Sequence, residues 1–229
     1  MTKLGQILRT FDITPALGRL APGWRGPLLA ALVALFAGSL SVFTLPALDR
    51  DESRFTQATA QMLETGDLTV IKFQDQPRFK KPVGIHWLQA ASVSAFSSPE
   101  ARQIWAYRLP SLLGAMLAAA ACAWGAAAFF TPGTALLAGV LLASTGLLST
   151  EASIAKTDAV LCGAITLAMA ALGRIYAARQ DGLAVGPWTK AAFWGGMALA
   201  TLVKRPLGPL ITLLTCLTLW VADRDGAWL

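Results

Sequence analysis

The segment DRDESRFTQATAQMLETGDLTVIKFQDQPRFKK, residues 49–81, separates one long apolar stretch from the mostly apolar remainder of the chain. It holds 12 ionisable side chains, whereas only 14% of the whole chain is charged. A charge at the centre of a bilayer costs roughly 3 kcal/mol or more. The segment is therefore expected to lie outside the hydrocarbon, and the apolar stretches around it decide the fold.

The composition is that of an integral membrane protein. The 229 residues are 55% hydrophobic, with a mean hydropathy of +0.55, above the usual range of soluble domains. The net charge of +6 comes largely from cations that flank apolar stretches, which indicates contact with anionic lipid rather than nucleic acid. The three cysteines lie in apolar runs and His86 is the single histidine. No metal site is predicted, and nothing in the sequence indicates a divalent cation or another cofactor.

Stretches without charge predict an all-α polytopic fold with about six membrane-spanning helices in one transmembrane domain, residues 1–229. The first expected span is Leu28–Leu45. The uncharged run between Arg108 and Glu151 is long enough for two helices, joined by a turn at Thr131-Pro132-Gly133. The remaining expected spans are residues 154–178, 188–203 and 206–222.

The distribution of charge predicts the orientation. Four cations precede the first span against one acidic residue, Asp12, which favours a cytoplasmic N-terminus and an uncleaved signal anchor. The cations are Lys3, Arg9, Arg19 and Arg25. Six crossings then place the 49–108 loop, the Glu151–Asp158 turn and the Lys204-Arg205 turn on the periplasmic face. Because mixed charge gathers on that face, a functional site is expected there.

Within the outer loop, residues 49–100, two juxtamembrane helices are predicted. Apolar residues recur at helical spacing from Asp51 to Thr65, and Gly66 is expected to end that helix. Residues 68–73 read as extended and 74–77 as a turn. Pro82 is expected in the first turn of the second helix, which runs to about Ser97. Both segments are typical of helices that lie at the membrane interface.

Four charged residues are candidates for chemistry. Asp51 and Arg54 can share a helix face, where a carboxylate could take a proton from an acceptor hydroxyl and an arginine could hold phosphate. The alternative is a simple solvated helix start. Lys81 precedes a helix N-terminus and is a plausible phosphate ligand, or an interfacial lysine that meets lipid headgroups. Asp158 lies at the start of an apolar span. It is interpreted either as a functional group or as the N-cap of that helix.

The residues Asp51-Glu52-Ser53-Arg54-Phe55, Glu64-Thr65-Gly66-Asp67, Lys81 to Trp87 and Lys156-Thr157-Asp158 together resemble a known family. They look like the N-terminal half of bacterial integral-membrane glycosyltransferases, which include protein O-mannosyltransferases and the 4-amino-4-deoxy-L-arabinose transferase that modifies lipid A. The resemblance implies a GT-C type fold in the bacterial inner membrane. It also implies a polyprenyl-phosphate-linked sugar as donor, and lipid A, another glycan or a protein as acceptor.

The resemblance assigns roles to individual residues. Asp51 matches the acidic residue that activates the acceptor, and Asp158 a second acidic residue in the same cavity. Donor phosphate is assigned to Lys81, Lys204 and Arg54. Glu52 and His86 are expected to support the site, His86 more by packing near Trp87 than as a base.

Family members are longer than this chain, which is therefore expected to be an N-terminal part. Two other functions stay open. A transporter or flippase would require polar residues deep in several spans, and the predicted spans hold few. A non-catalytic fragment is the other alternative.

Overall fold

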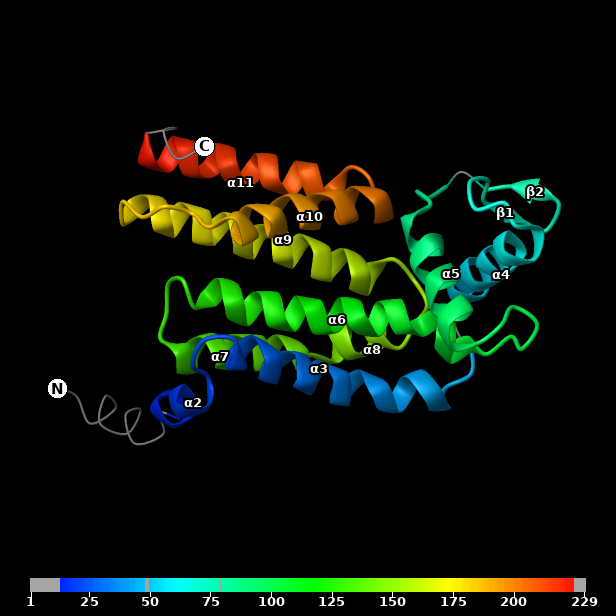
Figure 1. Cartoon of the computed structure of the whole chain (residues 1–229), viewed down its shortest axis with the longest axis horizontal. Coiled ribbons are helices and arrows are strands. Elements are labelled where there is room, and N and C mark those ends of the chain that lie inside the picture. The colour runs from blue at the N-terminus through cyan, green and yellow to red at the C-terminus, as the bar shows by residue number, and fades with distance from the viewer. Residues whose placement is uncertain (1–12, 48–49, 79, 225–229) are drawn as a thin grey trace.

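The computed structural model describes residues 13–47, 50–78 and 80–224, and these residues form a bundle of helices (Figure 1). Asp49 and the N-terminal Lys3, Arg9 and Asp12, on which some predictions rest, lie outside the described residues. The elements are α2 (Thr14–Leu20), α3 (Arg25–Thr44), α4 (Arg50–Thr65), β1 (Lys72–Phe73), β2 (Gln76–Pro77), α5 (Gly84–Phe96), α6 (Ile104–Ala126), α7 (Pro132–Ala143), α8 (Gly146–Ala152), α9 (Asp158–Gln180), α10 (Pro187–Val203) and α11 (Leu207–Asp223).

The long helices run side by side along the longest axis of the molecule (Figure 1). Helices α4 and α5 and the β1–β2 hairpin lie together at one end, here called the α4–α5 end (Figure 1). Helix α2 and the last turn of α11 lie at the opposite end (Figure 1). The predicted all-α polytopic fold is confirmed.

Three helices, α3, α6 and α9, are long and apolar enough to cross a membrane, and α7 with α8 makes a fourth if the bent pair is one span. The two other predicted spans are α10 and α11, of 17 residues each. A length of about 17 residues is the shortest that crosses the hydrocarbon. Length and composition therefore support three or four of the six predicted spans directly.

The structure corrects the prediction for the Arg108–Glu151 run. The turn at Thr131 is present, but the second helix is broken, with α7 and α8 bent by 61°. Ser144 and Thr145 donate side-chain hydrogen bonds to the carbonyls of Val140 and Leu142, both at 2.8 Å. Thr145 also caps α8 by accepting from the N–H of Leu148. Such side-chain bonds compete with the helix ladder and bend it.

The outer loop follows the predicted order with shifted boundaries. Helix α4 ends before Gly66, whose φ of +72° is the left-handed conformation of a helix C′ glycine. Of the expected extended residues only Lys72–Phe73 form a strand, which pairs antiparallel with Gln76–Pro77. Helix α5 begins at Gly84 with Val83 as N-cap, so Pro82 precedes the helix and does not form its first turn.

The fourth predicted span also begins later than expected. Helix α9 starts at Asp158, not near Ile154, and residues 153–157 form an irregular link from α8. This link is buried at Ser153, Ala155 and Thr157. Its backbone supplies hydrogen-bonding groups to the α4–α5 end, as described below.

Candidate active site

One apolar cluster brings together four elements that carry predicted site residues. Its buried members are Phe55 of α4, Ile85 of α5, Val160, Leu161 and Ala164 of α9, and Ala200 and Val203 of α10. Each element has a candidate residue close in sequence to these: Arg54 precedes Phe55, Asp158 is two residues before Val160, and Lys204 follows Val203. Packing of this cluster brings these stretches of α4, α5, α9 and α10 together.

Asp158 and Lys204 form a direct ion pair. The Lys204 ammonium donates to a carboxylate oxygen of Asp158 at 2.7 Å, with side chains 29% and 40% exposed respectively. Asp158 is the first residue of α9, where helix N–H groups favour a negative charge. Lys204 is the C-cap of α10. The sequence analysis considers these two residues separately, whereas in the structure they form one ion pair.

Asp51 and Arg54 share a face of α4, as predicted. Arg54 donates to Asp51 at 3.3 Å, and the two side chains are 32% and 54% exposed. An exposed pair of this kind adds about 1 kcal/mol or less to stability. Its position at the open end of the bundle leaves both groups accessible to a ligand.

The two neighbouring lysines differ in exposure. Lys80 is exposed, whereas Lys81 is partly buried. Gly84, three residues after Lys81, packs closely on α10, because a Cβ at this position would lie 2.5 Å from the carbonyl oxygen of Leu202. The start of α5 therefore lies against the end of α10, which places Lys81 and Lys204 on adjoining elements.

Glu52 is a buried structural anchor. Arg108 donates to both of its carboxylate oxygens, at 2.8 and 3.0 Å, and the two side chains are 1% and 2% exposed. The backbone N–H of Ala155 donates to the same carboxylate at 2.8 Å. The remaining N–H groups of Arg108 donate to carbonyls at the end of α3, those of Val42, Leu45 and Pro46.

This network joins α3, α4, α6 and the link before α9. Because every charge is paired and hydrogen-bonded, the pair is stable inside the protein. The network fixes the first turn of α4, and hence Asp51, relative to the start of α9. The expectation that Glu52 supports the site fits this position.

His86 is buried within a second polar network. Thr59 donates to the Gln89 side-chain oxygen at 2.8 Å, so the Thr59 oxygen accepts from His86 Nδ1, also at 2.8 Å. Gln89 in turn donates to the carbonyl of Ala155. The His86 side chain is 1% exposed, and burial lowers its pKa to about 4, with a smaller contribution from Arg78. His86 is thus neutral at pH 7 and packed inside the protein.

Sequence reasoning missed Arg108, Thr59 and Gln89. The available signal was Arg108 itself, the last charge before an uncharged run that extends to Glu151. A single arginine at the edge of such a run requires a carboxylate partner. The acidic pair after the first span supplies one. Among residues 13–47, 50–78 and 80–224, no three His, Cys, Asp or Glu side chains are grouped as metal ligands.

A large apolar cavity adjoins the site. It has a volume of about 710 Å³ and is lined by residues of α3, α5, α6, α9 and α10. Leu88, Val160 and Leu199 form part of its wall, and Val160 also belongs to the apolar cluster beneath the charged groups. The cavity and the apolar cluster thus share Val160 of α9.

The aligned apolar helices define a polytopic membrane protein. The chain belongs to the family described as dolichyl-phosphate-mannose-protein mannosyltransferase, whose profile matches residues 27–225. No curated protein matches the sequence.

Two solved structures are similar in fold, both of ArnT from Cupriavidus metallidurans. The apo structure matches with a TM-score of 0.72, and the structure bound to undecaprenyl phosphate with 0.73. In each case the identity is 22% and the match covers 86% of this chain. The chain spans 36% of the length of those proteins.

Proposed function

We propose that this protein takes part in transfer of a sugar from a polyprenyl-phosphate donor to an acceptor at the periplasmic face of the inner membrane. The observation that supports it most is the meeting of Asp158–Lys204 with the starts of α4 and α5 around one apolar cluster. Asp158 and Lys204 supply a carboxylate and a cation beside this cluster, and Asp51, Arg54 and Lys81 lie on or next to the elements that meet there. Family membership supports the same reaction class.

In the proposed reaction Asp51 accepts the proton of an acceptor hydroxyl. The acceptor oxygen forms a bond to the anomeric carbon, and the bond from that carbon to the donor phosphate oxygen breaks. The electron pair leaves with the phosphate, whose charge is stabilised by Arg54, Lys81 and Lys204. A positioned base of this kind contributes about 10²–10⁴-fold to rate.

Asp158 is assigned a role through Lys204. The Asp158 carboxylate accepts a hydrogen bond from the Lys204 ammonium at 2.7 Å, which fixes the position of the ammonium. This bond occupies one of the three N–H donors of Lys204, and the others stay available to a ligand. Glu52 and His86 have positioning roles, because both are buried in networks that hold α4 and α5 in place.

The apolar cavity of about 710 Å³ is assigned to the polyprenyl chain. A hydrocarbon tail requires an apolar path that opens next to the phosphate site, and Leu88 and Val160 provide it between α5 and α9. The same proposal places the α4–α5 end in the periplasm, since a polyprenyl-phosphate sugar would be used there.

Direct binding and turnover test this function separately. Purified chain in nanodiscs should bind undecaprenyl phosphate, measured by native mass spectrometry, and bind it less well when Lys204 is replaced by methionine. Release of undecaprenyl phosphate from an undecaprenyl-phosphate sugar, with acceptor present, then reports transfer. Binding that is absent, or that is unaffected by substitution of Lys204, Lys81 and Arg54 together, would overturn the proposal.

A further inference from the structure

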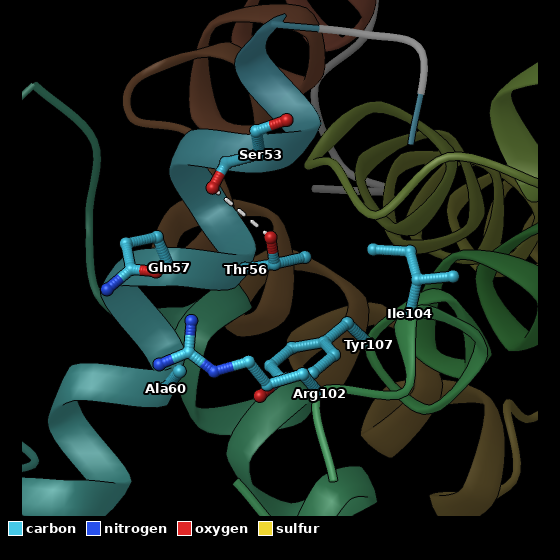
Figure 2. A pocket seen from close by; sticks show the side chains of 7 residues that line it. All are labelled: Ser53, Thr56, Gln57, Ala60, Arg102, Ile104 and Tyr107. Carbon is cyan, nitrogen blue, oxygen red and sulfur yellow. Dashed lines mark hydrogen bonds between the residues drawn. The ribbon is translucent and has the colours of Figure 1, made fainter. Parts of the chain in front are cut away.

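A separate polar pocket lies on the far side of α4 from the candidate active site. It has a volume of about 220 Å³ and is lined by Ser53, Thr56, Gln57 and Ala60 of α4 and by Arg102, Ile104 and Tyr107 at the start of α6 (Figure 2). Ala60 is nine residues after Asp51, which at 100° per residue is about 180° around the helix. The pocket therefore shares α4 with Asp51 but faces away from it.

Tyr107 presents a hydrogen-bonding group to the pocket. Its side chain is only 3% exposed, yet its hydroxyl has no hydrogen-bond partner among the residues that the structure describes. This hydroxyl is not among the fully buried unpaired polar atoms of the described residues, so it is the part of Tyr107 that opens to the pocket. Because Tyr107 lines the pocket, its hydroxyl is available to bond a molecule that occupies it.

The hydrogen-bonding groups of the pocket are mixed. Arg102 offers N–H donors, and Tyr107 and Gln57 can each donate and accept. Thr56 donates its one proton to the carbonyls of Glu52 and Ser53, so towards the pocket its oxygen can only accept. Glu64 lies 3.8 Å from Arg102 and balances its charge.

This mixture of donors and acceptors distinguishes between a phosphate headgroup and a sugar ring as the ligand. A phosphate headgroup presents only acceptors and would meet the acceptor oxygen of Thr56 unfavourably. A sugar ring presents hydroxyls, each of which donates and accepts, and its C–H groups can pack on Ile104 and the Tyr107 ring. At about 220 Å³ the pocket is smaller than sites for drug-sized ligands, roughly 300–1,000 Å³. It suits one ring and not a whole glycolipid.

We propose that this pocket binds a neutral hexopyranose ring of a glycan acceptor. The assignment to the acceptor rests on the proposed function, whereas the sugar-binding site itself does not. An acceptor with more than one ring could place one of them here and present a hydroxyl of another to Asp51 around α4, whose diameter with side chains is about 10–12 Å. A glycan or glycolipid is thus favoured over a protein as acceptor.

Saturation-transfer NMR on the purified chain in nanodiscs tests the site. The probes are methyl α-glucopyranoside, glycerophosphoethanolamine and inorganic phosphate. Tyr107→Phe removes only the hydroxyl, and Tyr176→Phe is the matched control, since the chain has two tyrosines and Tyr176 bonds Asp223 at the opposite end. Thr56→Val is a second variant that removes the acceptor oxygen.

The glucoside is expected to bind, and Tyr107→Phe to weaken it about three- to tenfold, with Tyr176→Phe unchanged. Thr56→Val should weaken the glucoside similarly. No glucoside signal, or equal signals in all variants, would overturn the proposal. A signal that depends on Tyr107 from a phosphate probe alone would also overturn it and assign the pocket to a lipid headgroup. Undecaprenyl phosphate binding, measured in the same samples, reports separately on the proposed function.

Discussion

The ammonium of Lys204 lies 2.7 Å from a carboxylate oxygen of Asp158, so the end of α10 is held to the start of α9. Both side chains are partly exposed, at 29% and 40%. A partly solvated pair contributes little to folding. Its position beside the starts of α4 and α5 makes a role in ligand binding the better explanation for two charges at the end of an apolar bundle.

Replacing Lys204 with methionine is therefore expected to leave the fold intact and weaken phosphate binding. The stability change should be about 1 kcal/mol or less, whereas loss of a charge-assisted hydrogen bond of roughly 1.5–3 kcal/mol lowers undecaprenyl phosphate affinity by at least tenfold. Thermal unfolding and native mass spectrometry measure the two effects. Lys190→Met, an exposed lysine in the first turn of α10, is the matched control and should change neither.

Asp51 and Glu52 are adjacent carboxylates with opposite expected phenotypes. Asp51→Asn should abolish sugar transfer with little change in stability, because Asp51 is 54% exposed. Glu52→Gln should destabilise the protein by roughly 3–5 kcal/mol, because Arg108 would be left as a buried charge without its counter-ion. Melting temperature and donor turnover, measured on both variants, distinguish them. Near-parental turnover in Asp51→Asn would show that Asp51 is only a helix-start residue.

Lys81 and Lys80 form a second matched pair. Lys81→Ala is expected to weaken donor use about ten- to a hundredfold through kcat/KM, and Lys80→Ala much less, since Lys80 is exposed and Lys81 is partly buried. The measurements should be made at two salt concentrations, because attraction of a surface lysine to anionic lipid is screened. Equal losses that vanish at high salt would remove Lys81 from the site.

The single histidine predicts an acid-sensitive fold. Burial lowers the pKa of His86 to about 4 from an ordinary 6.5, so the unfolded chain binds a proton more readily than the folded protein. The stabilisation is present above pH 6.5 and is lost as pH falls towards 4. Between pH 7.5 and 5 this group alone should cost up to about 2 kcal/mol.

Melting temperatures of the parent and His86→Gln over pH 5–7.5 measure this contribution. The variant lacks the titrating ring, so its melting temperature should fall less over this range than the parent's. Identical slopes for the two proteins would mean that His86 does not couple folding to pH.

The orientation is tested by labelling single cysteines in a variant without Cys122, Cys162 and Cys216. Asp75→Cys lies in the exposed β1–β2 turn and Ala184→Cys in the exposed loop after α9, at opposite ends of the bundle. An impermeant maleimide should label Asp75→Cys in intact spheroplasts and Ala184→Cys only after lysis. The reverse pattern would place the α4–α5 end in the cytoplasm.

The sequence alone determined where most helices form. Uncharged runs bounded by charge predicted the spans, Gly66 predicted the end of α4, and Thr131-Pro132-Gly133 predicted the turn before α7. These features are local, because hydropathy, helix spacing and turn residues act over a few neighbouring positions. The bend between α7 and α8 was missed, since its cause is the side-chain bonding of Ser144 and Thr145 within an apolar run.

Only the tertiary structure decided which polar residues are partners. Lys204 and Asp158 are 46 residues apart, and Arg108 and Glu52 are 56 apart. No spacing rule connects such residues, because their distance depends on how α3, α4, α6, α9 and α10 pack. Packing made Glu52 a buried anchor while its neighbour Asp51 stayed exposed, although a helical pattern alone gives both as acidic residues of the first turn. The physical reason is that burial, and the pairing it requires of each charge, is a property of the assembled bundle and not of the local sequence.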